Sequence, residues 1–113
     1  MLKDCNHEPI QGSSICAICP KPDDWQQHAS CLDHDPDLWF CPEDRPDLIE
    51  VAVRICLSCP IRGFCLEEGW SNKWGIWGSF TALEREKIRK VFPVTKQPPT
   101  HRRQIIRTIA HRL

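Results

Sequence analysis

The chain has no tyrosine, one methionine and five glycines among its 113 residues. It has no apolar run long enough to cross a membrane, and Asp4 stands where a secretory signal would be basic. We therefore expect a cytoplasmic protein, in which clustered cysteines are more often metal ligands than disulfides. The sequence also lacks a Gly-rich phosphate loop and a nucleophile elbow, and this favours a protein that is not an enzyme.

What the chain does have is eight cysteines and five tryptophans. A domain of this size has little buried core for its surface, so apolar packing alone is expected to hold it poorly. Small scaffolds usually add a metal site or disulfides. Eight cysteines in 113 residues fall below the share of roughly 8–10% that marks disulfide scaffolds, so a metal is favoured.

The net charge of zero hides a strong asymmetry along the chain. Residues 1–50 carry eleven acidic side chains and three basic ones. From Arg85 onward the chain carries nine basic residues, and Glu86 is the one acidic residue. A basic excess of this kind is typical of nucleic-acid binding. The side chains from which we expect DNA contacts are Arg85, Lys87, Arg89, Lys90, Arg102, Arg103 and Arg107.

Helix signals predict an all-α fold of about four short helices after an irregular N-terminal arm. Asp23 stands in a capping-box position for a first helix that runs through Cys31. Asp44 should cap a second helix that leads to Cys56, and a short third helix should follow the Cys-Pro step at 59–60.

The clearest local signal is a capping box at Thr81 and Glu84, which opens a helix that must end before Pro93. After a stiff Pro-Pro linker at 98–99, Thr100 could cap a basic amphipathic helix. Its expected apolar face consists of Ile105, Ile109 and Leu113. The chain then divides into a Cys/His arm at 1–22, a central domain at 23–92, and a linker with a basic helix at 93–113.

The cysteine spacing is the strongest chemical signal. Cys56 and Cys59 form a C-x2-C pair, which can place two thiolates on one metal site. Cys65 follows six positions later and Cys31 comes from a distant segment. Such uneven spacing suits an iron-sulfur cube, whose four irons lie apart and need thiolates from different directions.

Other arrangements use the second C-x2-C pair, Cys16 and Cys19. Joined to Cys56 and Cys59, the pair would form a four-thiolate zinc site, although the gap of 36 residues exceeds the roughly 15–20 of zinc ribbons. The two pairs could also serve a thiol-disulfide oxidoreductase, but no βαβ pattern surrounds them. The arm could instead hold its own zinc ion through Cys5, His7, Cys16 and Cys19, with Cys41 or His28 as an alternative to His7.

Five motifs follow one another between residues 23 and 90. They are Trp25-x3-Ala29-x-Cys31, Asp35-Pro36-x-Leu38-Trp39-Phe40, Ala52-x2-Ile55-Cys56-x2-Cys59-Pro60-Ile61-Arg62-x2-Cys65-Leu66, Gly75-Ile76-Trp77-Gly78 and Glu84-Arg85. Their order and spacing resemble the WhiB-like proteins of actinobacteria and their phages. The chain departs from that pattern at Ser79, where the turn usually ends in glycine, and at Cys41, a fifth cysteine near the motif region.

The resemblance implies a transcription regulator whose helices pack around a 4Fe-4S cluster. By that resemblance, the cluster ligands are Cys31, Cys56, Cys59 and Cys65. It further implies that the turn faces the C-terminal domain of the primary sigma factor, and that the basic tail contacts promoter DNA. The partner-binding residues expected in the turn are Trp74, Gly75, Ile76, Trp77 and Gly78. We expect a monomer that binds no membrane.

Within that turn, Trp77 is the residue expected to anchor the partner. The glycines on both sides leave its indole unshielded and permit left-handed backbone, so the ring can be presented at a surface. Trp70 and Trp74 are equally compatible with the core and with the interface.

Overall fold

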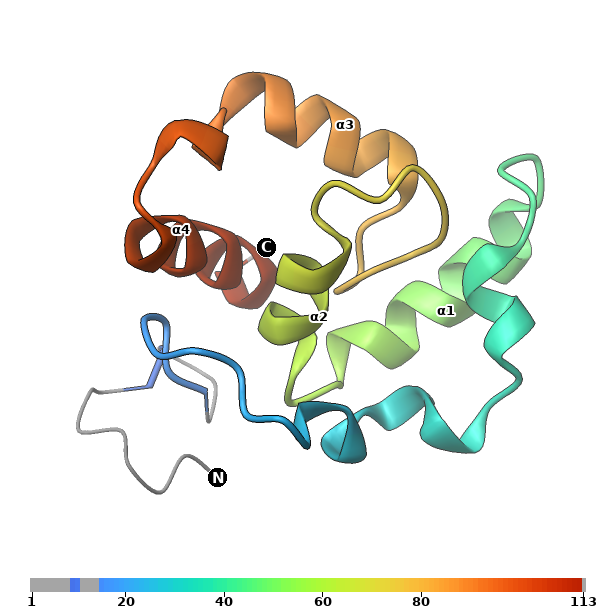
Figure 1. Ribbon diagram of the computed structural model, residues 1–113. Helices are drawn as coiled ribbons and strands as arrows, with labels where there is room; N and C mark the ends of the chain where they lie inside the picture. Colours follow the sequence, from blue (N-terminus) through green and yellow to red (C-terminus); the bar gives the residue numbers. More distant parts are fainter. Residues whose placement is uncertain (1–8, 11–14, 113) are drawn as a thin grey trace.

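The computed structural model describes residues 9–10 and 15–112 (Figure 1). Its α-helices are α1 (Pro46–Leu57), α2 (Arg62–Gly69), α3 (Ala82–Val91) and α4 (Pro99–Arg112). Its 3₁₀ helices are η1 (Trp25–His28), η2 (Ser30–Asp33), η3 (Pro36–Phe40) and η4 (Val94–Lys96). Extended pairing in the described ranges is limited to isolated bridges, so the predicted all-α fold is confirmed. No helix in this part of the chain is long and apolar enough to span a membrane.

Helix α2 lies at the centre of the molecule, with α1 on one side and α4 on the other (Figure 1). The most extensive helix pairing is that of α2 with α4. Leu66 within α2 and Trp70 just beyond its end pack with Phe80 and with Ile106 and Ala110 of α4. The C-terminal helix is therefore part of the core.

The N-terminal arm and the α1 region each add a further apolar cluster. Ile10 and Ile15 of the arm pack against Ile61 and Phe64, next to Cys59. On the other side, a cluster joins η3, α1 and the turn after α2 through Trp39, Ala52, Cys56 and Ile76. Two of the predicted metal-ligating cysteines, Cys56 and Cys59, thus lie at the edges of these clusters.

Local capping signals were reliable at α3. The Thr81 hydroxyl accepts from the Glu84 N–H at 3.2 Å, and the Glu84 carboxylate accepts from the Thr81 N–H at 2.9 Å. The helix ends at Val91, two residues before Pro93, as predicted. The short helix after residues 59–60 is also confirmed as α2.

Two predicted caps are wrong. The helix expected from Asp23 is two 3₁₀ turns, because Ala29 adopts an extended backbone with φ −73° and ψ 132° that interrupts it. In α1, Arg45 rather than Asp44 is the N-cap residue and makes no side-chain cap. Pro46, which has no N–H to donate, takes the first helical position and sets the start of the helix there.

The register of α4 also differs from the prediction. The helix starts at Pro99, and its fully buried residues are Ile106, Arg107 and Ala110. Ile105 and Ile109, placed at the centre of the apolar face by the sequence pattern, are only partly buried. Leu113, the third residue of that pattern, lies outside the described residues.

Candidate metal centre

The four predicted ligands line a single cavity of about 360 Å³. Cys31 comes from η2, Cys56 from α1, Cys59 from the α1–α2 connection and Cys65 from α2. The distant segment η2 thus meets α1, α2 and the connection between them at one space. The other walls of the cavity are mostly apolar and include Trp39.

Hydrogen-bond donors point at the cavity sulfurs. The indole Nε1–H of Trp39 donates to Cys56 Sγ at 3.1 Å in a buried position. Backbone N–H groups of the following turn add to this: that of Ser79 bonds Cys56 and that of Gly78 bonds Cys65. Such donors stabilise thiolates over thiols and tune a bound metal centre.

The environment of the thiols is otherwise unfavourable for negative charge. Burial raises the pKa of Cys31 and Cys56, and raises the pKa of Cys65 to about 12. Neighbouring cavity thiols add a smaller upward effect on each pKa. Thiolates in this site therefore need a positively charged partner.

No three His, Cys, Asp or Glu side chains among the described residues are close enough to hold a single ion. The four cavity thiols come from separate segments and line one cavity of about 360 Å³. A cluster of several irons needs this arrangement, because each thiolate binds a different iron. The donor set and the space thus fit an iron-sulfur cluster.

The turn between α2 and α3 closes one side of the cavity, and its backbone is left-handed at Gly75 (φ 79°), Gly78 (φ 58°) and Ser79 (φ 77°). A Cβ on Gly78 would lie 2.6 Å from the carbonyl oxygen of Arg62, so this position excludes any side chain. Ser79 adopts a conformation that glycine tolerates better, at a cost of about 1–2 kcal/mol.

Arg85 holds this turn in place from α3. Its side chain is fully buried, and its guanidinium donates to the carbonyl oxygens of Gly75 (2.8 Å), Phe80 (2.6 Å), Asn72 (3.1 Å) and Trp74 (3.0 Å). Burial lowers the pKa of Arg85 to about 10, which leaves it charged at neutral pH. The predicted DNA contact is wrong for Arg85, because no part of its side chain reaches the surface.

The tryptophans of the turn divide differently from the prediction. Trp77 is half-buried, lines the cavity and packs over Gly69, where the missing Cβ leaves room for its ring. Its indole N–H donates to the Trp74 carbonyl at 3.0 Å. Trp74 is 73% exposed, whereas Trp70 is 4% exposed. The exposed aromatic of the turn is therefore Trp74.

Comparison with known proteins agrees with this geometry. The sequence model of the transcription factor WhiB family matches residues 25–88, which include all four cavity cysteines. The chain belongs to the WhiB family. The WhiB match ends before α4 and begins after the N-terminal arm.

Several transcriptional regulators of this family are similar to the chain. WhiB of Streptomyces coelicolor is 38% identical over 68 residues, which cover 58% of this chain and 76% of that protein. WhiB2 of Mycolicibacterium smegmatis is 37% identical over 70 residues, covering 60% of this chain and 53% of that protein. The probable regulator WhiB7 of Mycobacterium tuberculosis is 48% identical over 50 residues, which cover 42% of this chain and 52% of that protein. No solved structure matches the chain significantly.

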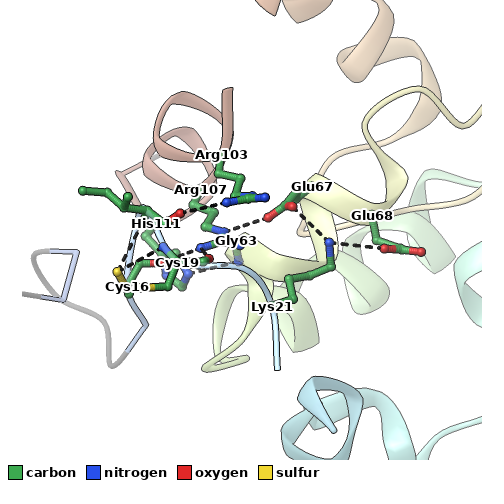
Figure 2. A network of polar contacts seen from close by, with 10 residues as sticks. Cys16, Cys19, Lys21, Gly63, Glu67, Glu68, Arg103, Arg107 and His111 are labelled. Carbon is green, nitrogen blue, oxygen red and sulfur yellow. Dashed lines mark hydrogen bonds and ion pairs between the residues drawn. The ribbon is translucent and has the colours of Figure 1, made fainter. Parts of the chain in front are cut away.

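Outside the WhiB match, α4 turns a predicted DNA-binding residue inward. Arg107 is fully buried and donates to Glu67 Oε1 at 2.7 Å and to the Cys16 carbonyl at 2.9 Å (Figure 2). Its guanidinium also lies 4.7 Å from the centroid of the Phe64 ring. These contacts make Arg107 a core residue, so the predicted DNA contact is wrong for Arg107.

The other basic residues differ in exposure. Arg89 donates to the Trp70 carbonyl at 2.6 Å and Arg103 to the Ile18 carbonyl at 3.2 Å, and both are partly buried, as is Arg102. Lys87 and Lys90 on α3 are exposed.

The second C-x2-C pair forms a tight turn in the arm. Cys16 Sγ accepts from the backbone N–H of Ile18 at 3.3 Å and of Cys19 at 3.4 Å. Among the described residues, no three of these four thiols lie close enough to hold one ion, so the structure does not show the alternative zinc site that joins this pair to Cys56 and Cys59. The physical reason is that the arm turn packs against α4, whereas Cys56 and Cys59 line the cysteine cavity described above. The remaining ligands predicted for the arm, Cys5 and His7, lie outside the described residues.

Proposed function

We propose that this WhiB-family protein is a transcription regulator, not an enzyme, that binds a 4Fe-4S cluster through Cys31, Cys56, Cys59 and Cys65. The observation that carries the proposal is the convergence of these four thiols, from four segments, on one largely apolar cavity. The cluster would supply one-electron chemistry, with a potential set by burial and by hydrogen bonds to sulfur.

The chain's own residues bind, orient and shield that group. The thiols bind it, and Trp39 and the N–H groups of Gly78 and Ser79 direct positive dipoles at the sulfurs. Ile55, with other apolar walls of the cavity, keeps water away from it. Because the four ligands come from separate segments of the chain, we propose that binding and folding are coupled.

A second part of the proposal is that the protein docks on the C-terminal domain of the primary sigma factor. Trp74 is 73% exposed and Phe40 is 58% exposed. The Phe40 ring also borders Gly75, the residue after Trp74, so two aromatic side chains flank the turn. Large aromatics are the usual anchors of interfaces. Exposed carboxylates at Asp35 and Asp37 lie just before Phe40 and would steer a basic DNA-binding domain.

DNA contact is the third part. Lys87 and Lys90 remain exposed on α3, and we propose that they contact promoter phosphates after sigma has delivered the protein. Contacts of this kind add affinity and position without reading bases. We further propose that the protein acts as a monomer in the cytoplasm.

The deciding experiment is anaerobic purification followed by an absorption spectrum and iron and sulfide analysis. The wild-type chain should be brown with about four irons, and Cys31→Ser, Cys56→Ser, Cys59→Ser and Cys65→Ser should each lose the cluster. Cys41→Ser is the matched control, because Cys41 is partly buried but does not line the cavity. A colourless wild-type protein that holds zinc in this cavity would contradict the proposal.

The sigma interface is tested by co-purification with the primary sigma factor. Trp74→Ala should abolish it while the cluster spectrum stays intact, because Trp74 does not line the cavity. Leu83→Ala is the control, since Leu83 is also exposed but lies on α3. Equal sigma binding by both variants would show that the interface lies elsewhere.

We also propose a zinc ion in the arm, held by Cys16 and Cys19 with Cys5 and His7. The support is the pair of N–H···S bonds to Cys16, which pre-organise the turn for a metal. Zinc content should fall by about one equivalent in Cys19→Ser and stay constant in Cys41→Ser. Zinc that is unchanged in Cys19→Ser would remove this site.

A further inference from the structure

A second cavity, of about 360 Å³, lies between the end of α2 and the start of α4. None of its lining residues belongs to the cysteine cavity. Its polar lining includes Lys21, Ser71, Arg102 and Arg103, together with the indole of Trp70. Its volume is within the range of about 300–1,000 Å³ that is usual for small-molecule sites.

Two buried hydrogen-bond donors in the residues that line this cavity have no acceptor. They are Nε1 of Trp70 and Nε of Arg102, neither of which has a partner within the part of the chain that the structure describes. Trp70 is 4% exposed, so water reaches its indole poorly. Buried donors are almost always paired in folded proteins, and both groups can only donate. A ligand that completes the site must therefore present acceptors.

The charges around the cavity favour an anion. Its carboxylates are already paired: Lys21 Nζ lies 3.0 Å from Glu67 and 3.5 Å from Glu68, and Arg107 Nε lies 2.7 Å from Glu67 (Figure 2). Arg102 and Arg103 then add positive charge that no carboxylate of the described residues neutralises. Both lie in the first turns of α4, where the helix dipole is positive.

We propose that this cavity binds the phosphate group of an anionic ligand. The phosphate oxygens accept hydrogen bonds from the Arg102 guanidinium and the Trp70 indole, and the exposed Ser71 hydroxyl is a third donor. Arginine recognises phosphate well, because its planar guanidinium donates several hydrogen bonds to phosphate oxygens. This proposal depends neither on the cluster nor on the sigma interface.

The test is a titration of the full-length protein, as purified, with inorganic phosphate and then with pyrophosphate. The Trp70 indole N–H resonance, followed by ¹H–¹⁵N NMR and assigned with Trp70→Phe, should shift in a saturable way. Arg102→Gln, which keeps much of the side-chain length but removes the charge, should weaken binding about tenfold or more. Arg54→Gln makes the same charge change on the exposed face of α1 and should bind like the wild type.

Two results would overturn the proposal. One is the absence of a saturable shift at Trp70, and the other is an equal loss of affinity in Arg102→Gln and Arg54→Gln, which would indicate unspecific charge attraction. Adding promoter DNA distinguishes the source of the phosphate group. If DNA and pyrophosphate compete, the site takes a phosphate of the DNA backbone. If they bind independently, it takes a small phosphorylated molecule.

Discussion

The guanidinium of Arg85 donates a 2.8 Å hydrogen bond to the carbonyl oxygen of Gly75, and so ties α3 to the turn that closes the cysteine cavity. Gly75 has a left-handed backbone, and three further carbonyls of the same region accept from Arg85. Arg85, which the charge pattern assigned to DNA binding, thus shapes the wall of the cysteine cavity.

We predict that Arg85→Lys lowers the free energy of unfolding by about 2–4 kcal/mol, because an ammonium cannot reach four carbonyls and stays buried without them. Denaturant unfolding of the cluster-loaded protein measures this. Arg54→Lys is the control, since Arg54 makes an exposed pair with Glu50 that should contribute less than about 1 kcal/mol. Equal stability of the two variants would show that the turn stands without Arg85.

Trp39→Phe should lower the reduction potential of the cluster. Phenylalanine keeps the apolar wall but removes the N–H that donates to Cys56 Sγ at 3.1 Å, and a sulfur with fewer hydrogen bonds stabilises the reduced state less. Redox titration followed by absorbance gives the potential. Trp25→Phe serves as the control, because Trp25 lines the same cavity but contacts the Phe64 ring. The same potential shift in both variants would contradict a specific role of the N–H group.

Gly78→Ala should abolish cluster binding. A Cβ there would meet the Arg62 carbonyl oxygen at 2.6 Å and the Leu66 backbone nitrogen at 2.9 Å, so the turn must move and withdraw its N–H from Cys65. Ser79→Gly should keep the cluster and change the stability by less than about 1 kcal/mol, because relief of left-handed strain offsets the entropy cost of glycine. Iron content per chain reports cluster binding in both variants, and denaturant unfolding reports the stability of Ser79→Gly. A full cluster in Gly78→Ala would mean that the turn adapts.

The docking of α4 should weaken in acid through His111. Burial, with a smaller contribution from Arg62, lowers the pKa of His111 from 6.5 to about 4, and its Nε2 accepts from the Gly63 N–H at 3.0 Å. In the unfolded chain, His111 therefore binds a proton below about pH 6.5, whereas in the folded chain it binds that proton only below about pH 4. The contribution of neutral His111 to the stability is fully present above pH 6.5 and is lost as the pH falls toward 4.

The measurement is the difference in thermal midpoint between wild type and His111→Asn, taken from pH 7 to pH 4.5. Asparagine retains an acceptor for Gly63 but does not titrate. The thermal midpoint of the wild type should therefore fall more than that of the variant as the pH falls. His101→Asn is the control, because His101 is exposed at the start of α4. A constant gap across this pH range would exclude His111 as the titrating group.

Local signals in the sequence determined a good deal of this protein. The capping box at Thr81, the helix stop before Pro93 and the short helix after residue 60 depend on neighbours within a few residues, so they survive in the folded chain. The cysteine spacing and the order of motifs likewise pointed to the four thiols that line the cavity and to the WhiB family. These features depend on the order and spacing of residues along the chain, so the sequence alone determines them.

Only the tertiary structure decided which charged and aromatic side chains lie inside. Arg107 is buried because partners 40 and 91 residues away accept its hydrogen bonds, and no sequence pattern shows which carbonyls will be within reach. Arg85 is buried for the same reason, by carbonyls of a turn that precedes its helix. Trp77 packs inward because Gly69 leaves space for it. Periodicity and charge describe each segment alone, whereas burial depends on the surfaces that other segments bring to it.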